Sequence, residues 1–421
     1  MTDLAVVGGR VLDPGQGIDA TANVLISDRV ITGIEEDTEG VGRRRRAQPG
    51  GPAGGWPELM GRGGVWGGRP PEATQLDASG LIVVPGLVDL HTHLYRGVSH
   101  YGIDADAYCL DRGVTTAVDA GSSGAQTFPG LHRYIIEPAQ TRILAFLHIA
   151  VQGMITNLLG ELEDLRWASV TQAVERAREH PDVIVGIKVR LGYQMVGDDP
   201  APAMRRAREA ADTLGLPLMV HVIDMRPPIS WLLPYLGRGD IVTHCFHGNP
   251  GGILDADGRL FPEVRRARER GVRFDVGHGV GSFAYRVARS AIAQGFPPDT
   301  ISSDLHAHNV AGPAYDQATT LSKLLHVGME LPDVIRATTA TPAVATRRHD
   351  RIGALAPGRD ADLTGFEMRT GRWDLPDAAG ATEVVERLLV PRLVVRGGEI
   401  RRLDPDTDPG RRTTSVRDLS S

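Results

Sequence analysis

The feature that most constrains the fold is a series of eight short apolar runs, rich in β-branched residues, that alternate with helix-like segments. The runs occupy residues 81–93, 115–121, 142–150, 183–192, 217–224, 240–246, 272–278 and 299–306. Near-continuous apolar strands that alternate with helices are typical of a parallel sheet buried on both faces. Eight such units over about 220 residues therefore predict an α/β fold, a (β/α)8 TIM-type barrel.

Both ends of the chain have β character and flank the barrel. The simplest architecture pairs them into one small β-sandwich domain, formed by residues 1–80 and 350–403 around a barrel at 81–349. Residues 38–74 are rich in Gly, Pro and Arg without any period, which predicts a flexible insertion that cannot bury enough apolar surface to order itself. Residues 404–421 are polar and predict a flexible tail.

The composition excludes several classes of partner. The net charge of −6 gives no indication of a nucleic-acid partner. The longest apolar runs are too short to span a bilayer, and the first residues lack the basic start and apolar core of a signal peptide. Two cysteines imply no disulfide framework. We therefore expect a cytoplasmic protein that acts on a small-molecule substrate, without a nucleic-acid or membrane partner.

Chemically active side chains stand where the predicted strands end. His91 and His93 are one residue apart in a strand, so both face the same side. Functional groups of a barrel gather at the C-terminal ends of its strands. The other runs contribute Lys188, His221, His244 and Asp304 there. Two unrelated histidines would explain a single His-x-His pair, but several strands that end in His and Asp favour a site for zinc or a similar divalent ion.

Lys188 is unusual in this chain. Of the 46 basic residues only two are lysines, Lys188 and Lys323. An ammonium that points into a barrel is costly unless it is paired. It could act as a Schiff-base nucleophile, or CO2 could convert it into a carbamate that bridges two ions. With four histidines and an aspartate around it, the second alternative balances the charge better.

Several motifs of the chain resemble those of the amidohydrolase superfamily. They are PGLVDLHTHLYRG, VGIKVRLG, PLMVHV, DIVTHCFHG and TISSDLH. Two further stretches, FPEVRRARERGVRFDVGHG and GPAYDQATTLSKLL, resemble the dihydroorotase-like amidohydrolase/deacetylase subgroup. The resemblance covers nearly the whole chain except 38–74 and the C-terminal tail.

The resemblance implies a binuclear metal centre. One ion would be held by His91, His93 and Asp304, the other by His221 and His244, and an N-carboxylated Lys188 would bridge them. A metal-bridging hydroxide would be the nucleophile, and Asp304 would act first as general base and then as general acid. We expect two zinc ions, although manganese would suit the same ligands.

Five further residues are candidate substrate contacts: Arg190, His278, Tyr95, Arg96 and His247. Arg190 should face the same side of its strand as the site lysine and could clamp a substrate carboxylate, although a surface arginine at a loop start fits equally well. His278 ends the seventh run, Tyr95 and Arg96 follow the first two ligands, and His247 stands where the resemblance implies Asn.

The leading hypothesis is a deacetylase-like hydrolase that removes an acyl group from a small carboxylate-bearing amide or ester. The alternative is a cyclic amide hydrolase of the dihydroorotase or hydantoinase kind, for which Arg96 stands three residues after His93 instead of the expected two. A non-catalytic scaffold on this fold would be expected to lack metal ligands, and a Schiff-base lyase would leave the histidines unexplained. Relatives in the subgroup commonly form oligomers, which leaves room for a homo-oligomer.

Overall fold

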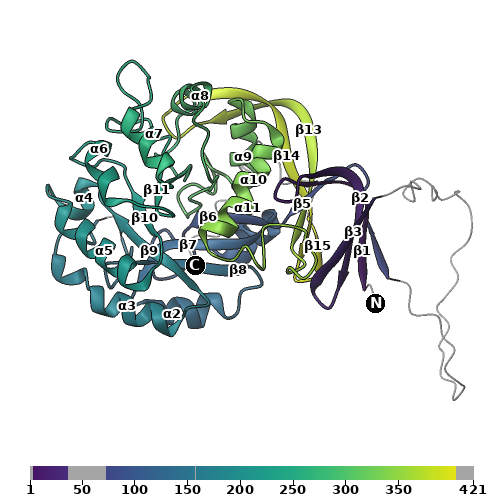
Figure 1. Cartoon of the computed structure of the whole chain (residues 1–421), viewed down its shortest axis with the longest axis horizontal. Coiled ribbons are helices and arrows are strands. Elements are labelled where there is room, and N and C mark those ends of the chain that lie inside the picture. Colours follow the sequence, from purple (N-terminus) through teal and green to yellow (C-terminus); the bar gives the residue numbers. More distant parts are fainter. Residues whose placement is uncertain (1–2, 37–72, 157, 404–421) are drawn as a thin grey trace, which may run out of the picture.

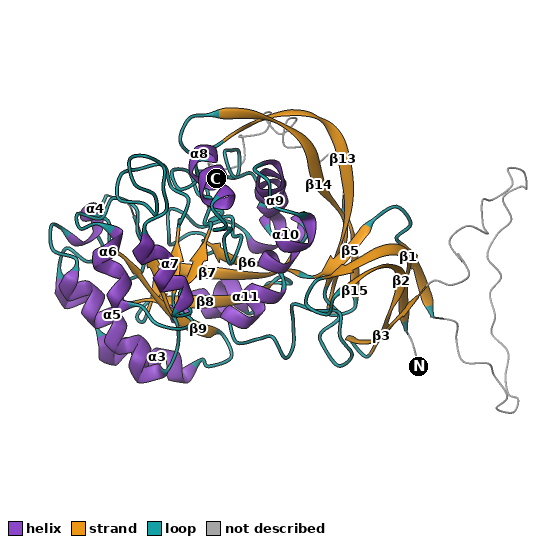
Figure 2. Ribbon diagram, turned by 45° about the horizontal axis from the view of Figure 1, so that its top comes forward, coloured by secondary structure: helices purple, strands orange, loops and turns teal. Residues whose placement is uncertain are grey.

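The computed structural model describes residues 3–36, 73–156 and 158–403. Its larger part is built on a curled sheet of seven parallel strands with helices around the outside (Figures 1 and 2). In spatial order the strands are β6 (Leu87–Thr92), β7 (Val114–Gly124), β8 (Arg142–His148), β9 (Ile184–Arg190), β10 (Leu218–His221), β11 (Ile241–Thr243) and β12 (Arg273–Asp275). The expected TIM-type barrel architecture is confirmed.

The segment from Thr300 to Leu305 takes the eighth position in the barrel. Thr300 forms a parallel bridge with Asp275 of β12, and Leu305 forms one with Thr92 of β6. The segment is not a regular strand, because Asp304 has a left-handed backbone with φ of +48°, which interrupts an extended ladder. The barrel is therefore closed by two isolated bridges at the place where a predicted site residue stands.

Helices cover the outside of the barrel wall. The longer ones are α3 (Val170–Glu179), α5 (Ala201–Leu214), α7 (Pro262–Glu269), α8 (Tyr285–Ala293), α9 (Gln317–His326) and α10 (Leu331–Thr338). The shorter ones are α1 (Ala105–Tyr108), α2 (Phe128–Leu131), α4 (Tyr193–Val196), α6 (Ile229–Leu232) and α11 (Ala340–Ala345). Within the described residues, none of these helices combines the length with the apolar character that a membrane span requires.

Helix α5 shows why these segments are helical. Small residues recur on one face at helical spacing, from Ala203 through Ala207 to Ala210, and all are fully buried. Such a stripe lets the helix pack closely on the sheet. The helix ends at Gly215, whose φ of +62° is the left-handed conformation of a helix C-terminus that glycine adopts without strain.

Both chain ends join one mixed sheet of eight strands beside the barrel, as expected. Its order is β15 (Glu399–Arg402), β14 (Thr382–Arg396), β13 (Leu363–Pro376), β5 (Ile82–Pro85), β1 (Leu4–Asp13), β2 (Ile18–Ser27) and β3 (Val30–Glu36), with β4 (Thr74–Asp77) paired to β1. The apolar run at 81–93 thus supplies two strands, one to each part of the molecule. The predicted insertion at 38–74, apart from its last two residues, and the tail at 404–421 lie outside the described residues.

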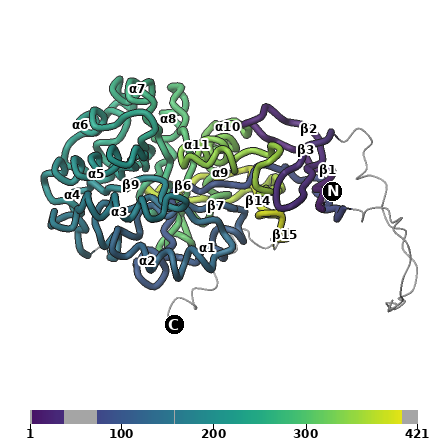
Figure 3. The backbone as a smooth tube through the Cα atoms, turned by 60° about the horizontal axis from the view of Figure 1, so that its bottom comes forward, coloured from purple at the N-terminus to yellow at the C-terminus, as the bar shows by residue number. Residues whose placement is uncertain are grey.

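The hairpin of β13 and β14 reaches from this sheet over the outside of the barrel, along α9 (Figures 1 and 3). Its own residues Leu375, Val385, Leu388 and Val390 form a small buried cluster. The base of the hairpin is therefore part of the small sheet, and the rest of it packs against the outside of the barrel.

A partly buried arginine joins the barrel to the small sheet. Arg142 at the start of β8 pairs with Asp360 at 2.6 Å and with Asp362 through its second terminal nitrogen, which also donates to Thr116. The side chains of Arg142 and Asp362 are 16% and 3% exposed. Solvent therefore screens this junction far less than it screens a surface ion pair.

We expect Arg142→Met to lower the free energy of unfolding by about 3 kcal/mol, because it leaves the buried carboxylate of Asp362 without its arginine. Asp360 keeps Arg351, which lies 3.0 Å away. The matched control is Arg10→Met, which breaks an ion pair with Asp19 whose side chains are 47% and 44% exposed and should cost less than about 1 kcal/mol. Urea unfolding followed by circular dichroism measures both. Equal effects of the two substitutions would contradict this account of the junction.

Candidate active site

The structure brings the six predicted metal-site residues together at one mouth of the barrel. His91 lies in β6 with His93 directly after it, Lys188 lies in β9, His221 ends β10, His244 directly follows β11, and Asp304 lies in the closing segment. His91, His244 and Asp304 place ligand atoms within 4.8 Å of one another. The rings of His221 and His244 are 4.4 Å apart, and Lys188 Nζ is 3.2 Å from His91 Nε2.

Asp304 is at the centre of this cluster. Its Oδ1 atom is 3.1 Å from His93 Nε2 and 3.3 Å from His91 Nε2. This oxygen is buried and has no hydrogen-bond partner among the described residues. A buried carboxylate oxygen without a donor is unfavourable, and a divalent cation would satisfy it together with the imidazole nitrogens. The residues present therefore fit a metal.

The ring of His91 is held by a chain of hydrogen bonds behind it. Its Nδ1 atom is 2.9 Å from Thr243 Oγ1, and the threonine hydroxyl donates to Asp275 at 2.8 Å. Asp275 also accepts from Thr300 and Ser302, both at 2.7 Å. Since the threonine proton goes to Asp275, its oxygen accepts from His91 Nδ1, which leaves the Nε2 lone pair directed at the cluster.

His93 and His244 are oriented in the same way. His93 Nδ1 is 2.9 Å from Ser122 Oγ on β7, and His244 Nδ1 donates to the Gly277 carbonyl at 2.8 Å. His244 also has a left-handed backbone, with φ of +69°. Strained backbones of this kind in residues other than glycine persist only where the surrounding structure enforces them, typically at functional sites.

Burial sets the protonation of the cluster. It lowers the pKa of His93 and of His244 to about 3, and it lowers the pKa of His91 and His221 well below the ordinary value. All four imidazoles are therefore neutral near pH 7, which is the form that binds metal.

Burial also changes the chemistry of the site lysine. It lowers the pKa of Lys188 to about 7, although the carboxylate of Asp304 acts in the opposite direction. A substantial fraction of the side chain is then the neutral amine near pH 7, whereas an ordinary lysine is almost entirely charged. The neutral amine is the form that can add CO2.

The predicted substrate contacts fall into two groups. Arg190 is buried on the same face of β9 as Lys188, with Nε 3.4 Å from Glu161 and the guanidinium 5.9 Å from the centre of the Tyr101 ring. His247 is buried near His244, and both its ring nitrogens lack a hydrogen-bond partner within the described residues. These two side chains keep polar groups available to a ligand.

The other three candidates have their polar atoms engaged elsewhere. The Tyr95 hydroxyl donates to the Thr127 carbonyl at 2.9 Å, and exposed Arg96 lies 3.8 Å from Asp104. His278 Nε2 is 2.9 Å from Lys323 Nζ. The ring of His278 is thus hydrogen-bonded to Lys323. The strand-end pattern of the sequence predicts instead that it faces the mouth of the barrel.

Three residues near the cluster were missed from the sequence. His148 ends β8 opposite Lys188 in the strand ladder, and its Nε2 atom is 3.4 Å from Glu161. Tyr101 lies against the rings of His93 and His306, at 5.5 and 5.1 Å between centres. The strand-end rule would have found His148, but Glu161 and Tyr101 come from loops without any periodic signal.

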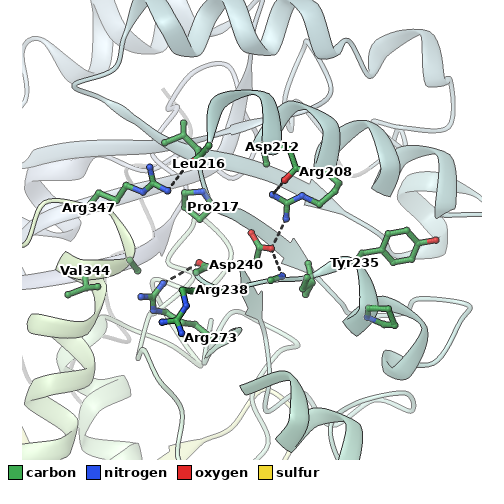
Figure 4. Close-up of a pocket in the computed structure, with 17 residues that line it drawn as sticks. Arg208, Asp212, Leu216, Pro217, Tyr235, Arg238, Asp240, Arg273, Val344 and Arg347 are labelled. Atoms are coloured by element: carbon green, nitrogen blue, oxygen red, sulfur yellow. Dashed lines mark hydrogen bonds and ion pairs between the residues drawn. The ribbon is translucent and has the colours of Figure 1, made fainter. Parts of the chain in front are cut away.

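A cavity of about 640 Å³ lies at the opposite ends of the strands (Figure 4). It is bordered by Pro217 before β10, Asp240 before β11 and Arg273 at the start of β12. Asp240 accepts from Arg208 and from the backbone of Leu218 and Gly237, so it has a structural role there. None of the metal-site residues lines this cavity.

Comparisons with known proteins agree with this geometry. A model of the amidohydrolase family matches residues 282–401. A deacetylase from Agrobacterium fabrum is 38% identical over 331 residues, which cover 78% of this chain and 81% of that protein. The chain belongs to the amidohydrolase superfamily. A deacetylase from Enterococcus faecalis is 33% identical over 326 residues, or 76% of this chain and 87% of its own length.

A crystal structure of a dihydroorotase superposes with a TM-score of 0.82 at 33% identity and covers 95% of this chain and 98% of its own. This likeness confirms the dihydroorotase-like subgroup, and together with the deacetylase relatives it confirms a hydrolytic enzyme. A dihydroorotase from Citrifermentans bemidjiense matches less of the sequence, with 28% identity over 53% of this chain and 43% of that protein. The cyclic amide alternative therefore fits less well.

We expect Thr243→Val to weaken metal binding by about 10- to 100-fold, because it removes the hydrogen bond that orients His91. Competition with a chromogenic chelator measures the affinity. Thr364→Val is the control, since Thr364 on β13 of the small sheet is equally buried and donates to the Gly113 carbonyl. Unchanged affinity in Thr243→Val would contradict the orienting role of this threonine.

Proposed function

We propose that this enzyme removes a small acyl group from a carboxylate-bearing amide or ester, with two divalent ions, zinc in the first place, at the cluster. His91, His93 and Asp304 would hold one ion, His221 and His244 the other, and an N-carboxylated Lys188 would bridge them. The observation that carries the proposal is the buried, unpartnered Oδ1 atom of Asp304 between two imidazole Nε2 atoms. When bound, the ions would supply Lewis acidity and a water of lowered pKa.

The charge of the cluster supports carboxylation of Lys188. Four neutral histidines, one carboxylate and a lysine that is partly neutral and partly charged near pH 7 give a ligand set with at most one negative charge, which is poor compensation for two dications. A carbamate at Lys188 would give the set two negative charges. The Nζ atom already lies beside His91 Nε2, so the added group would form within the cluster.

Asp304 is proposed as the proton carrier. It would accept a proton from the attacking water and return it to the leaving group. Its Oδ1 atom, between the two imidazole Nε2 atoms, would face the ion, and the second carboxylate oxygen would carry the proton.

Arg190 is proposed to bind the carboxylate of the substrate. It lies two residues after Lys188 in β9 and so faces the same side. Glu161 engages it at Nε, which would fix the plane of the guanidinium while its terminal nitrogens bind a carboxylate bidentately. Removal of an acyl group is supported by the deacetylases of Agrobacterium fabrum and Enterococcus faecalis. The likeness to a dihydroorotase structure supports cyclic amides as the second candidate class.

We expect about two divalent ions per chain in the wild type and a clear loss in Lys188→Ala, measured by elemental analysis of purified protein. Val189→Ala is the matched control, since Val189 is the next residue of the same strand and is equally buried. One ion or none in the wild type, with no change on substitution of Lys188, would contradict the bridging role. Trapping by borohydride with a carbonyl compound would then test the Schiff-base lyase.

We expect Arg190→Met to raise KM for N-acyl and O-acyl carboxylates by about 10- to 100-fold, through loss of a charge-assisted pair. KM for an uncharged ester with the same acyl group should change little. Arg226→Met, at an exposed arginine over the Tyr193 ring, is the control. Turnover of cyclic amides but not of open-chain acyl compounds would favour the second candidate instead.

A further inference from the structure

The second lysine of the chain, Lys323 on α9, is fully buried outside the metal cluster. Its Nζ atom lies within hydrogen-bond distance of three acceptors that come from three separate segments. They are His278 Nε2 at 2.9 Å, the Pro313 carbonyl at 2.6 Å and the Pro376 carbonyl at 2.7 Å. A buried ammonium is costly unless such partners surround it.

The arrangement requires a lysine. His278 Nδ1 donates to the Gly279 carbonyl at 3.0 Å, so the Nε2 atom carries a lone pair and accepts from Lys323. Three acceptors around one nitrogen match the three hydrogens of an ammonium, whereas a guanidinium spreads its donors over a planar fork. Burial lowers the pKa of Lys323 to about 7, and the carboxylates of Asp377 and Asp316 act in the opposite direction. Only the protonated form satisfies all three acceptors.

The first segment held by Lys323 lies against the carboxylate of Asp304. His278 and Gly279 donate through their backbone nitrogens to the carbonyls of Ser302 and Ser303, at 3.2 and 3.0 Å. At Gly279, with φ of +56°, a Cβ atom would lie 2.5 Å from Asp304 Oδ2. The backbone of this loop therefore forms one wall of the space that the Asp304 side chain occupies.

The second segment holds the backbone of Asp304. The Asn309 side-chain amide donates to the Asp304 carbonyl at 2.7 Å. The Asn309 carbonyl in turn accepts from the backbone nitrogens of Gly312 and Tyr315, at 3.0 and 3.1 Å. Pro313 lies inside this turn, so its contact with Lys323 fixes the turn that holds Asp304 from the other side.

The third segment is the tip of the β13–β14 hairpin, which reaches over α8 and α9 (Figure 1). Pro376 ends β13, and the next residue, Asp377, accepts from the backbone nitrogen of Tyr285 at 3.0 Å. The backbone nitrogen of Ala378 donates to the Phe283 carbonyl at 2.8 Å. The tip is thus fixed to the start of α8 and gives the other two segments a firm support.

We propose that Lys323 is a positioning residue for Asp304. Its ammonium joins the two loops that flank Asp304, through His278 and Pro313, to the hairpin tip at Pro376. The proposal rests on the proposed role of Asp304 in the reaction, because the consequence of losing Lys323 is a misplaced carboxylate. Displacements of about 1 Å in an active site reduce turnover by about 100-fold.

The first test is Lys323→Met, which keeps all but the terminal atom of the side chain's length and removes its three donors. We expect kcat for the best acyl substrate to fall by about 10- to 100-fold, with KM within about threefold of the wild type, when both enzymes are assayed with saturating metal. Tyr285→Phe is the matched control, because it removes the hydrogen bond from a buried hydroxyl to the Leu375 carbonyl at the same tip. It should lower thermal stability but leave kcat close to the wild type. If kcat fell in proportion to the loss of thermal stability in both Lys323→Met and Tyr285→Phe, the proposal would be overturned.

A second pair of variants tests the link through His278 and covers the case in which Lys323→Met does not fold. The side-chain amide of His278→Gln reaches as far as Nε2 and can accept from Lys323, whereas that of His278→Asn cannot. We expect His278→Asn to lose kcat as Lys323→Met does and His278→Gln to keep most of it. The double variant Lys323→Met/His278→Asn should be no worse than one single variant, because the two residues act as a unit. The link would be overturned if the losses of kcat added up in the double variant, or if His278→Gln and His278→Asn lost kcat equally.

Hydrogen exchange of the backbone separates this proposal from the proposed function, since it needs no substrate. In Lys323→Met we expect faster exchange in residues 277–283 and 302–315 but not in β1–β3. Faster exchange in an enzyme that is inactive toward every acyl substrate would leave the positioning role standing and overturn only the reaction class. Unchanged exchange and unchanged kcat in an active enzyme would overturn the positioning role alone.

Discussion

The whole site depends on one unfavourable contact, a carboxylate oxygen of Asp304 that lies among imidazole lone pairs with no donor from the described residues. Both partners present negative electrostatic potential, so the arrangement is costly until a cation lies between them. The backbone contributes further strain, since Asp304 and His244 both have positive φ. Contacts such as this persist only because the surrounding barrel over-determines them, and they are the structural sign that the site is shaped for an ion.

The barrel enforces the cluster through the order of its strands. The partner of His91 is Thr243 on β11, that of His93 is Ser122 on β7, and that of His244 is the Gly277 carbonyl after β12. Each ring is thus oriented by a different element, so the ligand geometry depends on the closure of the whole sheet. This explains why the closing segment around Asp304 is held from two sides, by the loop after β12 and by the turn at 309–315.

Sequence periodicity could predict the cluster but not its surroundings. His91, Lys188 and His221 lie in regular strands and His93 directly follows one, so alternation fixes the side that each residue faces. His278 follows the same pattern, but Gly277 and Gly279 on either side of it have φ of +49° and +56°. The alternation fails there, and the side chain turns to Lys323. Glu161 was missed for a related reason, because it reaches His148 and Arg190 from a loop in which position carries no directional information.

Both lysines of the chain, Lys188 and Lys323, occupy positions that an arginine could not fill. Charge alone does not explain either of them, because this chain uses arginine at every other basic position. Lys188 lies where an amine of lowered pKa can be converted into an anion, a reaction that an arginine with its permanently charged guanidinium does not offer. Lys323 lies where three acceptors converge on one nitrogen. In an arginine-rich chain a lysine therefore marks a place where the chemistry or the shape of an ammonium is required, and both such places here lead to Asp304.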